Sequence, residues 1–187
     1  MKSHIFSAIR LTIVLLAVCC VVYPAFIWGI ACFTPSYGRG DTVEVNGKTV
    51  GYALIGQSFT QDKYFNGRPS AVGYNAAGSG GSNKGPTNPE YLASVQAAID
   101  TFLIKNPAVK RTDIPVELVT ASGSGLDPDI SPEAAYVQVP RIAKVRGISE
   151  DKLKTLVAQH VQGPLLGLFG PSKINVLQLN ISLDHTK

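Results

Sequence analysis

Lys84 is the residue that comes nearest to a phosphate-binding lysine, because it follows a glycine- and serine-rich run from Gly78 to Ser82. A nucleotide-binding loop of the Walker type has the pattern G-x-x-x-x-G-K-S/T, in which backbone N–H groups surround the phosphates and the lysine reaches them. Here Asn83 precedes Lys84 and Gly85 follows it, so both flanking requirements fail. The sequence therefore predicts no phosphate cradle at this lysine.

A serine nucleophile has no better support. The sharp turn that exposes a catalytic serine has the pattern G-x-S-x-G after a strand. The nearest stretch, Ala77-Gly78-Ser79-Gly80-Gly81, lacks the first glycine and follows no predicted strand. Serine enzymes of the penicillin-binding type combine S-x-x-K with S-D-N and K-T-G, and the last two patterns are missing. We predict no catalytic residue in this chain.

Histidine and acidic residues are too scattered to suggest a metal site. His4, His160 and His185 lie far apart in the sequence, and we expect His160 to be a packed or surface histidine. Asp127-Pro128-Asp129 offers two carboxylates, which do not make a calcium loop, so a turn before a helix at Ser131 is the favoured interpretation. We therefore predict no metal site and no cofactor of the chain's own.

The polar run from Tyr74 to Tyr91 is dense in glycine, serine and asparagine. Three interpretations stay open: an ordered loop that serves packing and turns, an ordered loop that faces a partner, and a flexible linker. Asparagine side chains hydrogen-bond nearby backbone and fix turns, which favours order. The candidate partner-facing residues are Asn75, Ser79, Ser82, Asn83 and Asn88.

The elements that position these residues begin with an apolar segment. Leu11 to Phe33 is a run of 23 residues without a charge, and as a helix it would span about 35 Å against a hydrocarbon core of roughly 30 Å. The apolar region of a secretory signal peptide is only about 7–15 residues long. A removed signal peptide is the alternative, but we predict an uncleaved transmembrane helix at 11–33.

The charges on either side of this segment predict its orientation. Lys2 and Arg10 precede it with no acidic residue before its end, whereas Arg39 after it is followed closely by two acidic residues. Positive charge favours the cytoplasmic side. We therefore expect a cytoplasmic stub at 1–10 and an extracytoplasmic soluble domain at 34–187, on a single-pass anchor.

The exported part has neither cysteine nor a strong charge. Cys19, Cys20 and Cys32 all lie in the apolar segment, so the domain has no disulfide and depends on its own core. Setting aside Lys2 and Arg10 leaves 15 basic and 13 acidic residues outside, and this near balance argues against nucleic-acid binding.

Helix and strand patterns alternate irregularly along the exported part, which predicts a single mixed α+β domain. Asn46-Gly47 lies between two alternating segments and predicts a hairpin over Thr42 to Ile55. A helix is expected from Pro89 to Asn106, with Asn88 as its cap and an apolar face that includes Leu92. The other expected elements are a strand at Val116–Thr120, a helix from Ser131 interrupted at Pro140, a helix from Ser149 with Leu153 and Val157 inside, and a closing strand from Ile174 to Leu183.

Three long stretches carry a family resemblance. The first begins with Tyr64-Phe65-Asn66-Gly67-Arg68-Pro69-Ser70-Ala71 and runs to Pro89; the second is VTASGSGLDPDISPEAAYVQVPRIAKVRG at 119–147, and the third is NVLQLNISLD at 175–184. Together they resemble the C subunit of Kdp-type potassium-transporting ATPases. With the apolar segment included, the resemblance covers nearly the whole chain.

This resemblance implies a place in a complex of the bacterial or archaeal inner membrane. The implied partners are a channel-like potassium-translocating subunit, a P-type ATPase subunit and a small accessory subunit. The implied role is non-catalytic: the subunit is needed for assembly and activity, as a catalytic chaperone that raises the ATP affinity of the ATPase subunit. ATP is the nucleotide proposed for the family, near the glutamine that corresponds to Gln138.

The predicted topology conflicts with a direct contact between Gln138 and ATP. It places Gln138 outside the cell, where there is little ATP, and no loop has the glycines and lysine of a phosphate cradle. We therefore expect any effect on ATP affinity to pass through the membrane subunits as a coupling free energy. The alternative function is a stand-alone, membrane-anchored extracytoplasmic binding or hydrolytic protein, which would work without partners.

Overall fold

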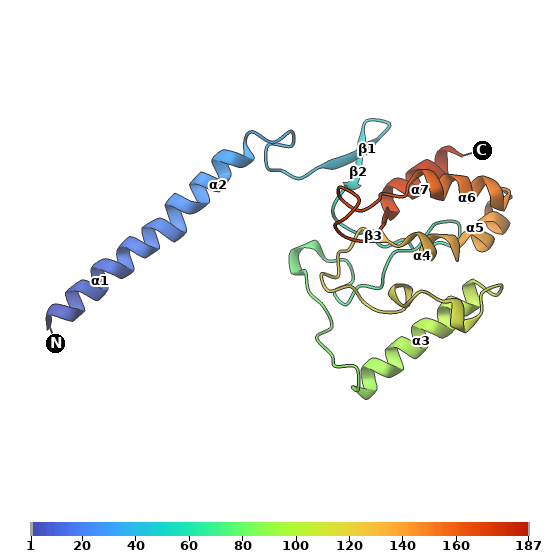
Figure 1. The fold of residues 1–187 in the computed structure, drawn as a ribbon, viewed down its shortest axis with the longest axis horizontal. Coiled ribbons are helices and arrows are strands. Elements are labelled where there is room, and N and C mark those ends of the chain that lie inside the picture. Colours follow the sequence, from blue (N-terminus) through green and yellow to red (C-terminus); the bar gives the residue numbers. More distant parts are fainter. Residues whose placement is uncertain (1, 187) are drawn as a thin grey trace. The chain divides into compact units, whose positions relative to one another are not determined.

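The computed structural model describes residues 2–186 and divides into two compact units, with the boundary after Asp41. The first unit is built on a long apolar helix, and the second is a mixed domain of helices and short strands (Figure 1). This confirms the predicted fold class.

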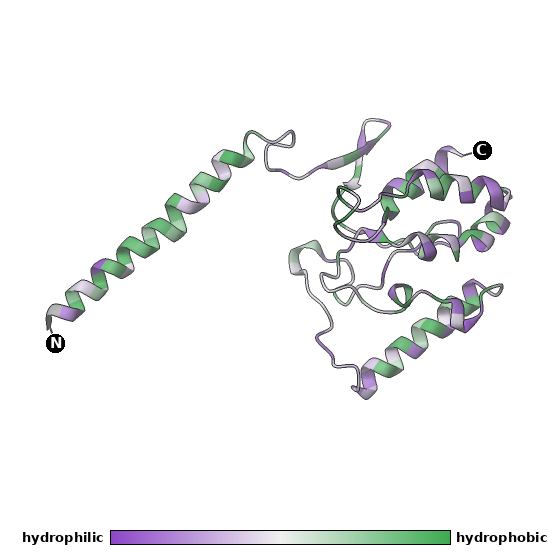
Figure 2. Ribbon diagram, in the orientation of Figure 1, coloured by the Kyte–Doolittle hydropathy of each residue, from purple (hydrophilic) through white to green (hydrophobic). Residues whose placement is uncertain are grey.

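The long helix is continuous through three segments: α1 (Lys2–Ala17), a π-helical segment (Val18–Val22) and α2 (Tyr23–Ala31). Its stretch from His4 to Ala31 has 28 residues, and the most apolar 18 of them have a mean hydropathy of 2.6 and no buried part, so its length and composition suit a membrane span. Figure 2 shows hydrophobic residues along most of this helix. It begins earlier than the predicted 11–33 and ends two residues sooner.

The π-helical segment lies directly before Pro24, which occupies the first turn of α2. A proline inside an α-helix has no N–H for the carbonyl one turn earlier, and its ring crowds that carbonyl. A wider turn relieves this crowding, and π-helical turns are commonly single insertions of this kind. The helix therefore continues past Pro24 instead of ending there.

Two small antiparallel sheets lie in the described part of the second unit. The predicted hairpin is confirmed as β1 (Thr42–Val45) and β2 (Lys48–Tyr52). Asn46 and Gly47 both have positive φ, of 53° and 75°, as a two-residue hairpin turn requires. The second sheet pairs β3 (Asp129–Ile130) with β4 (Ile174–Asn175).

Helix α3 (Pro89–Lys105) begins and ends as predicted. The Asn88 side chain accepts a hydrogen bond from the Tyr91 N–H, and Pro89 takes a first-turn position that needs no donor. The expected inward face is only partly realised, because no residue of α3 is fully buried and Leu92 is exposed.

Four helices surround the main core: α4 (Pro132–Tyr136), α5 (Val139–Arg146), α6 (Glu150–Gln159) and α7 (Val176–His185). The predicted interruption at Pro140 is confirmed, since α4 ends at Tyr136 and Pro140 falls in the first turn of α5. Leu153 and Val157 of α6 are fully buried, as expected. The other fully buried apolar side chains include Phe65, Val139, Ile142, Leu179 and Leu183.

Two predicted strands are wrong. Val116–Leu118 forms a 3₁₀ turn after Pro115, with Val116 exposed and only Leu118 inside. The predicted closing strand is α7, which is preceded by two residues of strand. Its apolar residues alternate locally, but Asn175 caps a helix by accepting a hydrogen bond from the Gln178 N–H.

Candidate functional site

The glycine-rich loop at 78–82 is hydrogen-bonded to a second loop, at 122–125. The Gly80 N–H and the Ser79 hydroxyl both donate to the Ser124 carbonyl, at 2.8 and 2.9 Å. Nearby, the Ser70 hydroxyl donates to the Gly125 carbonyl at 2.6 Å. The linker interpretation is therefore wrong for this part of the run, which is ordered by contacts across more than 40 residues of sequence.

Glycine is required where the two loops meet. Gly125 has a φ of 67°, and a Cβ on it would lie 2.6 Å from Val72 Cγ2 and 2.7 Å from the Gly80 carbonyl oxygen. A Cβ on Gly81 would lie 3.1 Å from the Gly123 carbonyl oxygen. The backbones thus approach too closely for larger residues.

Three of the five candidate partner-facing residues use their side chains within the domain. Asn75 accepts a hydrogen bond from the Ala77 N–H and caps a 3₁₀ turn, Asn88 caps α3, and Ser79 binds the second loop. Ser82 and Asn83 are exposed, and their side chains make no hydrogen bond with any other described residue. These two remain the side chains with free capacity for a partner.

Lys84 is paired with an acidic side chain. Its Nζ lies 2.8 Å from Glu90 Oε2 in the first turn of α3. This hydrogen bond, together with the charge of Lys84, lowers the pKa of Glu90. Lys84 therefore stabilises the entry into the helix at an exposed position.

Gln138 is fully buried, and its amide group has a partner for each hydrogen bond that it can make. Its Nε2 donates to the carbonyls of Asn66 and Ala134, at 3.1 and 2.9 Å. Its Oε1 accepts from the Asn66 N–H and from Arg141 Nη2, both at 2.8 Å. The Gln138 side chain thus joins α4 and α5 to the segment around Asn66.

Arg141 extends the same buried network. Its Nε donates to Asn106 Oδ1 at 2.9 Å, and its Nη groups donate to the carbonyls of Asp62 and Tyr64. Burial lowers the pKa of the Arg141 guanidinium, and the nearby Asp62 carboxylate partly opposes this effect. The charge is thus held mainly by carbonyl oxygens and amides rather than by a bound carboxylate.

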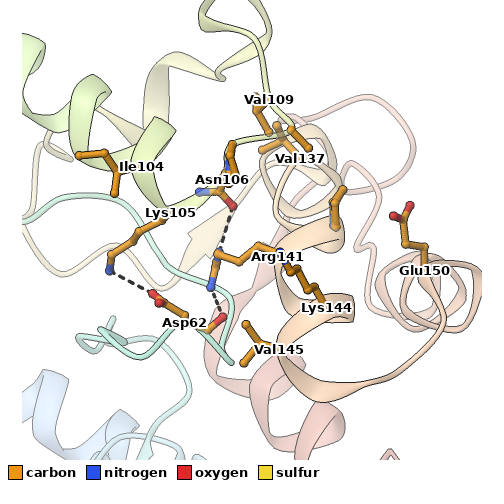
Figure 3. Close-up of a pocket in the computed structure, with 13 residues that line it drawn as sticks. Asp62, Ile104, Lys105, Asn106, Val109, Val137, Arg141, Lys144, Val145 and Glu150 are labelled. Carbon is orange, nitrogen blue, oxygen red and sulfur yellow. Dashed lines mark hydrogen bonds and ion pairs between the residues drawn. The ribbon is translucent and has the colours of Figure 1, made fainter.

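A cavity of about 670 Å³ lies beside Arg141, between the C-terminal end of α3 and helix α5 (Figure 3). Ile104, Val109 and Val145 give it apolar walls, and Lys144 adds a cation at its rim. The Arg141 guanidinium is engaged by Asn106 and the Asp62 carbonyl. No group of three or more histidine, cysteine or acidic residues that could hold a metal is found among the described residues.

Three of the remaining sequence candidates, His160, Asp127 and Asp129, have structural partners. His160 bridges α6 to α7, with Nδ1 2.8 Å from the Leu156 carbonyl and Nε2 2.8 Å from Ser182 Oγ. Asp127 accepts from the Asp129 N–H at 3.1 Å, which confirms a turn there. Asp127 also pairs with Arg68 and Asp129 with Lys173, at 3.2 and 2.6 Å.

The three sequence stretches that carry the family resemblance meet in one network. Asn66 of the first binds Gln138 of the second, and Asn180 of the third exchanges two hydrogen bonds of 2.9 Å with the backbone of Phe65. Sequence reasoning missed Asn66, Arg141 and Asn180. For Asn180, a polar residue among the apolar residues of α7, that position was the available signal, since such residues are buried only when hydrogen-bonded.

An apolar helix of spanning length followed by one globular domain is consistent with the class of single-span anchored proteins. The family described as "K+-transporting ATPase, c chain" (KdpC) matches residues 5–185. The chain therefore belongs to the KdpC family, as the resemblance predicted.

Similar proteins match along nearly their whole length. A protein of Flavobacterium psychrophilum is 56% identical over 185 residues, which cover 99% of this chain and all of the relative. One from Phocaeicola vulgatus is 54% identical over the full length of both chains. A third, from Caldanaerobacter subterraneus subsp. tengcongensis, is 48% identical and covers 98% of this chain and 95% of the relative. Each bears the name "Potassium-transporting ATPase KdpC subunit".

Proposed function

We propose that this chain is a non-catalytic accessory subunit of an ATP-driven potassium uptake complex, needed for its assembly and activity. It raises the ATP affinity of the ATPase subunit in the manner of a catalytic chaperone, without holding the nucleotide itself. The observation that carries this proposal is the state of Gln138: its side chain is fully buried and its hydrogen-bonding capacity is used by protein atoms. A nucleotide contact would require breaking that network.

The proposed partners are the channel-like potassium-translocating subunit, the P-type ATPase subunit and the small accessory subunit. The proposed location of the domain is outside the cytoplasmic membrane, because the basic residues Lys2 and Arg10 precede the span. The exposed Ser82 and Asn83, on a loop held in place by its glycine contacts, supply a rigid polar surface for a neighbouring subunit. Any effect on ATP affinity then reaches the other side of the membrane as a coupling free energy.

The test compares ATP use with ATP binding. The complex purified without this chain should need a higher ATP concentration for half-maximal hydrolysis than the complete complex. The full-length chain alone in detergent should retain no ATP in equilibrium dialysis. Gln138→Met keeps the side-chain length but removes the amide, so it should lower the melting temperature and leave the ATP affinity of the assembled complex unchanged.

Two outcomes would contradict this proposal. If the isolated chain binds ATP and folded Gln138→Met loses that binding, the nucleotide contact is direct. If the chain does not co-purify with an ATPase from its own membrane, the stand-alone alternative replaces the subunit role.

A further inference from the structure

The loop between α6 and β4 exposes a cluster of large apolar side chains. Leu165, Leu166, Leu168 and Phe169 are 70%, 81%, 81% and 63% exposed, and Figure 2 shows this loop as hydrophobic. We call residues 164–170 the apolar tip. Exposed apolar side chains are common when scattered singly, but a cluster of this kind marks a contact with another molecule or with a membrane.

The backbone of the apolar tip satisfies much of its own hydrogen bonding. Leu165 and Phe169 exchange two backbone hydrogen bonds, at 2.9 and 3.0 Å, and the Gly167 N–H donates to the Pro164 carbonyl at 2.9 Å. Below the tip, Gln162 and Lys173 exchange two more, at 2.8 and 2.9 Å. Backbone groups that are already paired lose little when water is removed, so the tip is suited to an apolar environment.

The conformation of Leu166 adds an independent indication. Its φ is 55°, in the left-handed region that glycine and asparagine enter easily and a bulky residue does not. Gly167 beside it is also left-handed, with a φ of 72°. A leucine held in this conformation, with its side chain 81% exposed, contributes nothing to the domain's own core. Its apolar side chain therefore serves a contact outside the domain.

Charge and chain length favour a lipid surface as the occupant. No charged residue occurs between Val161 and Ser172, so no ion would have to leave water with the tip. Only ten residues, Cys32 to Asp41, join the apolar helix to β1, and they can span at most about 35 Å. A tether this short holds the domain near the bilayer, where even weak insertion is strongly populated.

We propose that the apolar tip inserts into the lipid–water interface of the membrane that anchors the chain. Leu165, Leu166, Leu168 and Phe169 enter the boundary between headgroups and acyl chains, while the stem at Gln162 and Lys173 stays in water. The tip then acts as a second, reversible membrane contact beside the helix. This inference goes beyond the proposed function, because it needs no other subunit.

The test uses the full-length chain reconstituted alone in phosphatidylcholine vesicles. Trp28 is the single tryptophan, so Trp28→Phe gives a silent background. In that background, Phe169→Trp should show blue-shifted emission and at least about twofold quenching by lipids that carry a nitroxide near the headgroup. The matched control is Val116→Trp, because Val116 is 72% exposed in the same domain but lies outside the tip; its emission should not be quenched.

A second variant separates insertion from loop shape. Leu166→Gly removes the side chain, and glycine adopts the left-handed backbone easily. The melting temperature should therefore be unchanged or higher. The ratio of inserted to withdrawn tip should fall about tenfold, which corresponds to one large apolar side chain. The nitroxide quenching of the indole at position 169 should fall accordingly.

Three outcomes would overturn the proposal. Quenching at position 169 equal to that of the Val116→Trp control means that the tip stays in water. A blue shift without lipid quenching that appears only when the other subunits are co-reconstituted assigns the tip to a protein partner. A blue shift that grows with the ratio of protein to lipid assigns it to a second copy of the chain.

Discussion

Arg141 is a charged residue that the core holds through neutral oxygens. A guanidinium offers five N–H donors in one plane, and here they reach Asn106, Gln138 and the carbonyls of Asp62 and Tyr64. Arg141→Ala should lower the free energy of unfolding by about 3 kcal/mol or more, because several buried acceptors lose their donors. Arg141→Lys should recover only part of this loss, since an ammonium cannot match the planar arrangement.

Lys144 provides the matched control for Arg141. It lies on the same helix, is exposed, and has no hydrogen bond or ion pair with another described residue. Lys144→Ala should change the free energy of unfolding by less than about 0.5 kcal/mol. Denaturant unfolding of the two variants measures both effects, and equal losses would contradict a structural role for the buried guanidinium.

Ionisation of the Tyr74 phenol should destabilise the domain at alkaline pH. Its hydroxyl donates to the Arg68 carbonyl, and burial raises its pKa above 10.0, with the nearby Asp127 carboxylate adding to the shift. Because the folded state favours the neutral phenol, this stabilisation is complete below about pH 10 and is lost as the pH rises above that value. Tyr74→Phe should flatten the fall in melting temperature between about pH 9.5 and 11. An equally steep fall in the variant would contradict this assignment.

Local chemistry predicted single-residue roles better than long-range partners. Asn88 as a helix cap and Asp127 as a turn residue follow from interactions within three residues of sequence. Gln138 and Arg141 bind backbone 72 and 79 residues away. No periodicity in the sequence specifies such pairs, so their identity required the fold.

At the scale of elements, Gly125 is the tighter of the two glycines where the loops meet. Gly125→Ala should cost at least about 2 kcal/mol, because the added Cβ meets Val72 and the Gly80 carbonyl at a left-handed backbone. Gly123→Ala is the control in the same loop, since its Cβ would meet nothing within 4 Å. Thermal melting of both full-length variants measures the difference, and similar melting temperatures would argue against a tight approach.

Asn83 tests whether the glycine-rich loop faces a partner. Its φ of 52° makes alanine an unsuitable replacement, because a change in stability would follow from backbone strain alone. Asn83→Gly removes the side chain and keeps the conformation. The free energy of unfolding should change by less than about 0.5 kcal/mol. The affinity of the chain for its complex should fall by about 5- to 150-fold if a hydrogen bond across the interface is lost.

Ser82→Ala is the companion change, and co-purification with the ATPase subunit is the measurement for both variants. Unchanged assembly with both variants would assign these side chains to solvent. Weakened assembly in proportion to lost stability would instead assign them to the loop itself.

Elements with explicit end signals were predictable, and those decided by tertiary packing were not. Asn46-Gly47 and Asn88-Pro89 led to a correct hairpin and a correct helix start. In α7, by contrast, the apolar residues from Val176 to Leu183 fit a strand as well as a helix. The buried positions Val176, Leu179 and Leu183 follow helical spacing, and Asn175 as a cap was the signal that could have decided it.

At the scale of the whole molecule, the orientation of the anchor decides which partners the domain can meet. With the native cysteines replaced by alanine, Ala108→Cys in an exposed loop of the domain should react with a membrane-impermeant thiol reagent in intact cells. Ser3→Cys should react only after permeabilisation, because positive charge before a span favours the cytoplasmic side. The opposite pattern would place the domain in the cytoplasm, where ATP is abundant.

The π-helical segment at Val18–Val22 changes which side of the anchor meets a neighbour. Such a segment acts as one inserted residue, and each residue of an α-helix turns the chain by about 100°. A stripe of side chains along α1 therefore does not continue along α2, where Ala25 and Gly29 form a small-residue pair suited to close helix approach. One straight neighbouring helix therefore cannot pack along the same face of both α1 and α2. The two halves of the helix offer different faces for packing against neighbouring helices.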